Sequence, residues 1–330
     1  MSRRASATSV TSGPYAPPAP SRELTVFSAD GARLHVEVHG PEDAPPVVLS
    51  HGWTCSTAFW AVQIRDLAAD HRVIAYDQRG HGRSPASPAC TTRALADDLE
   101  AVLAQTLARG EKALIVGHSM GGMTVMAAAT RPRFREHAAA VLLCSTGSSR
   151  LVAESRVVPL RAGRVRTWIT GRVLGSRAPL GPVTPVAKSI LKYATMGAGS
   201  APHMVEACAR IVHACPRAVR HAWAGVLEAL DLDHGVRELH APTAVVHGAS
   251  DRLTPPVHAR ALVAALPHCV GLTELAGVGH MTPIEAPGPV IGRIRELVTT
   301  YVTVTGTGPD AEHAEHVEHR STPAQIKEGA

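Results

Sequence analysis

The sequence ALIVGHSMGG, residues 113–122, contains the pattern that decides the fold. Four apolar residues precede a pentapeptide that matches Gly-x-Ser-x-Gly, and a Met- and Ala-rich stretch follows it. We therefore expect a buried strand, a sharp turn that lifts the Ser119 hydroxyl off the sheet, and a helix. Gly117 and Gly121 remove side chains that would collide across such a turn. The motif in this context predicts a nucleophilic Ser119; the alternative is an inert serine in a Gly-rich turn.

Outward from this motif, short apolar runs bounded by Gly or Pro alternate with helix-like stretches. Continuous apolar runs are typical of strands buried on both faces, and the alternation predicts a mostly parallel, twisted sheet with helices on both faces. An Asp30-Gly31 turn between two alternating segments adds a hairpin at one edge. The fold class is therefore α/β. The predicted strands are residues 24–27, 33–39, 46–49, 73–76, 113–116, 139–144, 243–246 and 270–275, and the predicted helices are 57–69, 92–108, 121–130, 255–266 and 287–301.

One long segment, residues 148–237, interrupts the alternation with helix-like sequence only. Since it follows the strand next to that of Ser119, we predict that it forms a helical cap over the site. The core would then comprise residues 23–147 and 238–303. The flanking segments, 1–22 (rich in Ser, Pro and Ala, and expected to be disordered) and the polar tail 304–330, would lie outside it.

Composition excludes several function classes. The net charge of +5 comes without Lys/Arg blocks, so we expect no nucleic-acid partner. The six cysteines are scattered without a Cys-x-x-Cys pair, and no apolar run approaches the length of a membrane span. We expect a cytoplasmic protein that acts on a small-molecule substrate, with no stable membrane span, cofactor or metal, and with an oligomeric state left open. His313, His316 and His319 could form a weak metal site in the tail, although a solvated tail is the simpler interpretation.

Serine is a poor nucleophile unless a base takes its proton. His280 follows the last predicted strand in the sequence Gly277-Val278-Gly279-His280, where the base of this architecture is expected. The orienting acid should follow the preceding strand, and Asp251 is the only carboxylate in residues 248–255. Asp231 and Asp233, at the end of the predicted cap, are poorer candidates. The resulting chain order, Ser then Asp then His, is the order expected of this fold.

A developing oxyanion needs two backbone donors. One should be the amide of Met120, directly after the nucleophile. We assign the other to the amide of Trp53, in the loop after residues 46–49. Gly52 would permit a close backbone approach, and His51 is interpreted as a residue that orders this loop.

From about residue 24 to 302 the chain resembles the α/β-hydrolase superfamily. The resemblance rests on His51-Gly52, the Asp-x-Arg-Gly-x-Gly-x-Ser sequence of residues 77–84, the serine turn, Gly248-x-x-Asp251 and Gly279-His280. Haloalkane dehalogenases and epoxide hydrolases share part of this pattern but need a carboxylate where Ser119 stands. The resemblance therefore implies a serine esterase, lipase or thioesterase that forms an acyl-enzyme on a lipophilic substrate. Carbon–carbon bond hydrolases, acyltransferases and cofactor-free haloperoxidases (perhydrolases) remain alternatives, and a non-catalytic binding protein is a further one.

The predicted cap is rich in arginine as well as in apolar residues. Its guanidinium groups could recognise a carboxylate or phosphate, or contact an anionic membrane surface. A solvated face in an Arg-rich protein is the simpler interpretation. The arginines concerned are Arg161, Arg164, Arg166, Arg172 and Arg177.

Overall fold

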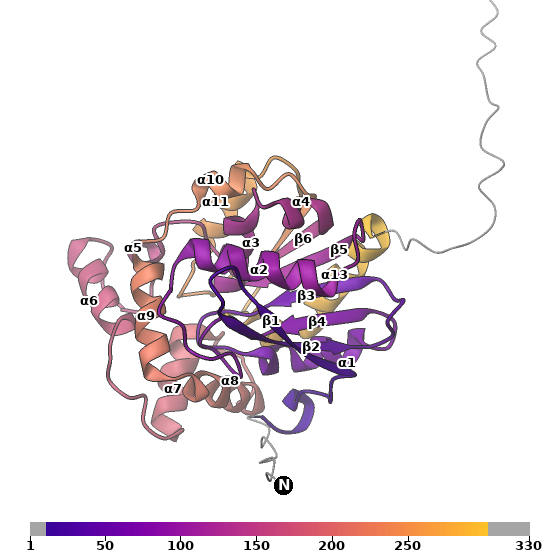
Figure 1. The fold of residues 1–330 in the computed structure, drawn as a ribbon. Coiled ribbons are helices and arrows are strands. Elements are labelled where there is room, and N and C mark those ends of the chain that lie inside the picture. Colours follow the sequence, from indigo (N-terminus) through magenta and orange to yellow (C-terminus); the bar gives the residue numbers. More distant parts are fainter. Residues whose placement is uncertain (1–10, 303–330) are drawn as a thin grey trace, which may run out of the picture.

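The computed structural model describes residues 11–302. Its centre is an eight-stranded sheet with the order β1-β2-β4-β3-β5-β6-β7-β8 (Figure 1). β1 and β2 form an antiparallel hairpin, β2 pairs antiparallel with β4, and all remaining pairs are parallel. The expected mostly parallel sheet with an edge hairpin is therefore confirmed. The strands are β1 Arg22–Phe27, β2 Arg33–His39, β3 Pro46–Ser50, β4 Arg72–Tyr76, β5 Ala113–His118, β6 Ala138–Cys144, β7 Thr243–Gly248 and β8 Cys269–Leu275.

Helices cover both faces of the sheet because the central strands are apolar on both sides. Every residue of β3, β4 and β5 is buried. One apolar cluster packs α2 and α3 against the sheet, and a second packs α1 and α13 against the opposite face. The helices outside the segment between β6 and β7 are η1 Gly13–Tyr15, η2 Thr57–Trp60, α1 Ala61–Leu67, α2 Thr92–Thr106, α3 Met120–Ala128, α4 Pro132–His137, α11 Val257–Ala265, α12 Thr282–Glu285 and α13 Pro287–Tyr301.

The N-terminal segment differs from the expectation of disorder over residues 1–22. Residues 13–15 form η1, and Tyr15 is buried in the cluster that also contains Trp60 and Ile64. Arg65 donates a hydrogen bond to the carbonyl of Ala16. The prediction was wrong for this part because one aromatic side chain anchors an otherwise polar, Pro-rich stretch. Residues 1–10, like the predicted tail at 304–330 with its three histidines, lie outside the described residues.

The segment between β6 and β7 is helical, as the sequence predicts. An isolated bridge between Ser149 and Asp231 joins its two ends near the sheet. Figure 1 shows α6 and α7 on the outer side of this segment, away from the strands. We call α5–α10 the insertion helices: α5 Leu151–Glu154, α6 Arg164–Leu174, α7 Pro185–Thr195, α8 Pro202–Ala214, α9 Arg217–Glu228 and α10 Asp233–Arg237. Within residues 11–302, no helix combines the length and the apolar character needed to cross a bilayer.

Candidate active site

Ser119 lies in the sharp turn between β5 and α3 that the motif predicts. Its backbone has φ 51° and ψ −116°, a strained conformation for a non-glycine residue. The turn is held by hydrogen bonds from the Ser119 amide to the carbonyl of Cys144 (3.0 Å) and from the Thr146 hydroxyl to the Ser119 carbonyl (2.7 Å). A Cβ on Gly117 would lie 2.6 Å from the backbone of Gly121, so the turn requires glycine there. The serine therefore occupies a rigid position above the carboxyl end of β5.

Asp251 and His280, the expected acid and base, are in direct contact. His280 Nδ1 lies 2.8 Å from Asp251 Oδ2, and both side chains are buried. The amides of Leu253 and Thr254 donate to Asp251 Oδ1 at 2.8 and 2.9 Å, and the Thr254 hydroxyl donates to Oδ2 at 2.8 Å. Burial alone would raise the pKa of Asp251, but the charge and hydrogen bond of His280 outweigh burial and lower it. An ionised Asp251 accepts from Nδ1–H and leaves Nε2 of His280 as the basic nitrogen.

Two residues that the sequence did not single out position His280 through its backbone. The His280 amide donates to the carbonyl of Thr195, in α7 of the insertion, at 2.8 Å. His118 Nε2 lies 3.0 Å from the His280 carbonyl. Burial, together with the charge of His280, lowers the pKa of His118 to about 3, so His118 is neutral and donates from Nε2. The position of His118, directly before the predicted nucleophile, could have identified it. Nothing in the sequence around Thr195 indicates its contact with His280.

Within residues 11–302, Ser119 and His280 meet at a cavity rather than through a direct hydrogen bond. Both line a cavity of about 620 Å³. Among residues 11–302, the hydrogen bonds do not include one between the Ser119 hydroxyl and His280. Such contacts are often long in ligand-free enzymes and tighten when substrate binds.

The two expected oxyanion donors flank Ser119. Met120 is the first residue of α3, and Trp53 lies in the loop after β3 and lines the same cavity as Ser119. Within the described part of the chain, neither backbone amide donates a hydrogen bond to another residue. Both N–H groups are therefore free to bind an oxygen atom of a ligand.

Hydrogen bonds of His51 hold the loop that carries Trp53 in place. His51 Nδ1 donates to the Gly52 carbonyl at 2.8 Å, and its Nε2 accepts from the amide of Gln78 at 3.0 Å. Burial lowers the pKa of His51 well below its usual value, in agreement with this neutral tautomer. A Cβ on Gly52 would lie 3.1 Å from Ser119 Cβ. The expected roles of His51 in ordering the loop and of Gly52 in allowing close approach agree with these contacts.

Two apolar spaces adjoin Ser119 and differ greatly in size. The larger, of about 620 Å³, is formed mostly by α6, α7 and the segment between them. The smaller, of about 40 Å³, lies among α3, α5 and α9. Trp53, Leu174 and Leu253 border both spaces. The smaller space is lined in addition by Met123, Leu151, Val152, Ala224, Leu227 and Glu228.

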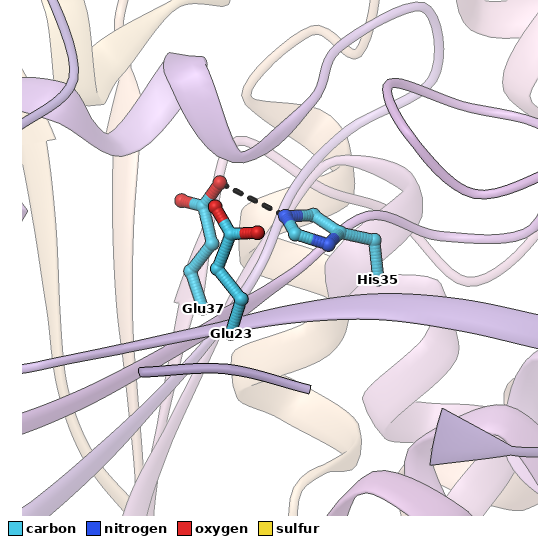
Figure 2. Close-up of side chains that lie close together, drawn as sticks. All are labelled: Glu23, His35 and Glu37. Carbon is cyan, nitrogen blue, oxygen red and sulfur yellow. Dashed lines mark hydrogen bonds and ion pairs between the residues drawn. The ribbon is translucent and has the colours of Figure 1, made fainter. Parts of the chain in front are cut away.

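A separate group of metal-ligand side chains lies on the edge hairpin (Figure 2). Ligand atoms of Glu23, His35 and Glu37 lie within 4.8 Å of one another, and the three side chains point toward one another. However, Arg83 contacts both oxygens of Glu23 at 2.7 and 2.8 Å, and His35 Nε2 contacts Glu37 at 3.0 Å. The charges of this group are thus compensated by Arg83 and by imidazole, and none of the three residues lines the cavities. Arg83 also lies 4.0 Å from Glu37, so its guanidinium bridges Glu23 of β1 and Glu37 of β2.

The comparisons with known proteins agree with this architecture. The family model described as the alpha/beta hydrolase fold matches residues 45–287. A protein from Variovorax paradoxus named as a carbamate hydrolase, RutD, is 33% identical over 229 residues, covering 67% of this chain and 80% of the relative. The non-heme chloroperoxidase of Streptomyces lividans is 38% identical over 121 residues, covering 36% of this chain and 43% of the relative.

Solved structures show the same fold. The esterase RhEst1 from a Rhodococcus species superposes with a TM-score of 0.71 at 24% identity, over 84% of this chain and 99% of that chain. The family match over residues 45–287, together with this geometry, shows that the chain belongs to the α/β-hydrolase fold family and is an enzyme of that family.

Proposed function

We propose that the chain hydrolyses a carboxylic ester of a lipophilic alcohol through an acyl-enzyme on Ser119. His280 Nε2 takes the serine proton and passes it to the leaving alcohol, while Asp251 holds the imidazole and offsets its positive charge. The amides of Trp53 and Met120 would stabilise the oxyanion, each contributing about 3–4 kcal/mol to lowering the barrier. The observation that carries the proposal is the 2.8 Å contact between Asp251 and His280 beside the strained serine turn.

The two spaces beside Ser119 support separate binding sites for the acyl and the alcohol parts of an ester. The smaller, about 40 Å³, has room for on the order of three water-sized groups, which suits a short acyl chain. The larger, about 620 Å³, is apolar and suits a bulky alcohol group. We therefore propose short-chain acyl esters of large apolar alcohols as the substrate class.

This assignment is tested with two ester series. In the first, p-nitrophenyl esters lengthen from acetate to decanoate; in the second, acetates of alcohols increase from ethyl to naphthyl. We expect kcat/KM to fall at least tenfold beyond butyrate in the first series and to hold or rise in the second. Leu227→Ala, which opens the smaller space, should extend the accepted acyl length. Its matched control, Leu180→Ala in the larger cavity, should leave the acyl preference unchanged. A preference for long acyl chains with small alcohols would reverse the assignment.

A second candidate reaction comes from the similarity to the Streptomyces lividans chloroperoxidase. Hydrogen peroxide instead of water could accept the acyl group from Ser119, giving a peracid. Peracid formation from p-nitrophenyl acetate and peroxide, lost in Ser119→Ala, would identify it. Ester hydrolysis that peroxide leaves unchanged would favour the hydrolase.

A further inference from the structure

The large exposed apolar side chains of this protein are concentrated on one surface. Ten are exposed among the described residues, and eight of them lie between residues 160 and 193. On α7, Val186, Ile190 and Tyr193 recur at spacings of four and three, so one stripe of the helix presents apolar groups to solvent. We call residues 160–193 the insertion surface. Its exposed apolar members are Leu160, Val165, Trp168, Val173, Leu180, Val186, Ile190 and Tyr193.

The insertion surface lies within a basic segment of the chain, residues 155–205, and Glu206, just beyond this segment, pairs with Lys188. Residues 155–205 contain six arginines and two lysines but no Asp or Glu, in a chain whose net charge is only +5. Within residues 11–302, no carboxylate pairs with any of the five arginines of this segment that are exposed. Elsewhere, some exposed arginines, such as Arg83 and Arg260, pair with carboxylates. Others that lie scattered over the described surface, Arg33, Arg109 and Arg237, have no carboxylate partner within residues 11–302. The five unpaired arginines are Arg156, Arg161, Arg164, Arg172 and Arg177.

Apolar and basic groups are interleaved rather than separated. The guanidinium of Arg172 lies 5.5 Å from the ring of Trp168, which is 63% exposed. Tryptophan beside arginine on an exposed helix is typical of proteins whose apolar side chains enter the headgroup region while their basic groups contact anionic lipid. In Figure 1, α6 and α7 lie on the outside of the molecule, where a flat partner can reach them.

The insertion surface is continuous with the cavity that contains Ser119. Trp168, Val173, Leu180 and Ile190 are exposed, and all four also line this cavity. A partner covering the insertion surface would therefore cover the route to the serine.

Charge decides between the partners that could cover this surface. A second copy of the chain, packed through the same patch, would bring two sets of unpaired arginines together, which is unfavourable. An anionic bilayer compensates these charges and buries the apolar groups at once. We propose that the insertion surface docks on a bilayer containing anionic lipids, with α6 and α7 at the headgroup level. The docking does not depend on the reaction; only its consequence, entry of an apolar substrate from the lipid, rests on the proposed function.

The test is binding of the full chain to vesicles of phosphatidylcholine alone or with a quarter of phosphatidylglycerol, measured by flotation at 0.1 and 0.5 M NaCl. We expect binding to the anionic vesicles only, weakened at least tenfold by the higher salt. Since each basic residue near an anionic surface contributes about a fivefold factor, the triple variant Arg161→Gln/Arg164→Gln/Arg177→Gln should also lose at least tenfold. Val165→Asp/Val186→Asp should abolish binding. None of these five residues lines the serine cavity, so hydrolysis of a dissolved short ester should be unchanged.

Matched controls use the same chemistry elsewhere on the surface. Phe27→Asp introduces acid at a 57% exposed apolar residue on β1, and Arg33→Gln/Arg109→Gln/Arg237→Gln removes three other exposed arginines. These variants should bind like wild type. Equal loss in the control and insertion variants, or no binding of wild type to anionic vesicles, would overturn the proposal. A dimer that Val165→Asp/Val186→Asp dissociates, without vesicle binding, would assign the surface to a second copy and also overturn it.

Discussion

The sheet region and the insertion surface differ in whether their arginines have carboxylate partners and whether their apolar side chains are buried. In the sheet region, Arg79 is 1% exposed and contacts Asp98 through two hydrogen bonds of 2.7 and 2.5 Å. Asp30 binds the same guanidinium at 2.8 Å. On the insertion surface, arginines lack carboxylate partners and large apolar side chains face outward. The sheet region therefore finds its partners within the chain, whereas the composition of the insertion surface is explained by contact with something outside it.

The largest expected effect concerns the sheet region's role in chemistry. Asp251→Asn should reduce kcat for p-nitrophenyl acetate by about 10⁴-fold, because an amide favours the wrong imidazole tautomer and cannot offset its charge. The matched control is Asp231→Asn, the alternative acid at the end of the insertion, which should retain activity. Retained activity in Asp251→Asn together with loss in Asp231→Asn would identify Asp231, in the insertion, as the orienting acid. The chemistry would then not belong to the sheet region alone.

The next effect concerns stability in the sheet region. Asp98→Asn leaves the guanidinium of Arg79 buried without its main carboxylate and should cost about 3–5 kcal/mol of unfolding free energy. Urea denaturation followed by circular dichroism measures this loss. Glu274→Gln, which removes the carboxylate from exposed Arg260, is the control and should change stability far less. Similar losses in the two variants would show that burial of an ion pair does not determine how much its removal destabilises the protein.

A pH effect should appear at the edge hairpin, where Glu37 contacts His35 (Figure 2). His39 Nε2 lies 3.5 Å from the other oxygen of Glu37. Burial would raise the pKa of Glu37, but the hydrogen bond with His35 and the nearby imidazole of His39 outweigh it and lower this pKa to about 2. Because the folded pKa is below the unfolded value, Glu37 stabilises the fold above about pH 4.5, and this contribution, roughly 3 kcal/mol at most, disappears as the pH falls toward 2.

Urea unfolding at pH 7, 4.5 and 3 measures this dependence. The unfolding free energy of wild type should fall more steeply between pH 4.5 and 3 than that of Glu37→Gln. Parallel curves would contradict the account of the hairpin.

The smallest effect is expected from the insertion surface. Val165→Asp/Val186→Asp should change the unfolding free energy by no more than about 0.5 kcal/mol, because both side chains are 68% exposed. Val141→Ala, at a fully buried position of β6, serves as the contrasting variant and should destabilise clearly. A loss above about 1 kcal/mol in the double aspartate variant would mean that these valines pack within the protein.

Local patterns account for the parts of the molecule that could be predicted. Continuous apolar runs identified the central strands, and the Gly-x-Ser-x-Gly motif identified the serine turn. A Cβ on Gly117 would meet Gly121, and one on Gly121 would meet the carbonyl of Ser50. The pairing of Asp251 with His280 could also be predicted, because each residue follows a predicted strand, and the two side chains are 2.8 Å apart. Their catalytic roles stay predictions. The predicted disorder of residues 1–22 was wrong for the described part, residues 11–22, because the Tyr15 side chain packs against Trp60 and Ile64 in an apolar cluster.

The walls of the two spaces beside Ser119 depend on how the insertion helices fold back. The contact from Thr195 to His280 spans 85 positions of the chain and has no local signature. The same holds for Leu227, which reaches the smaller space from α9. The arginines of the insertion could be read from the sequence. Only the structure shows that five of them have no carboxylate partner within residues 11–302.

The most direct test of the central claim is intact-mass analysis after treatment with a fluorophosphonate, on wild type and on Ser119→Ala. The account predicts that wild type gains the mass of one phosphonyl adduct, mapped to the peptide containing Ser119, and that Ser119→Ala gains none. Equal labelling of the folded Ser119→Ala variant, or folded wild type that neither labels nor hydrolyses any ester, would contradict it.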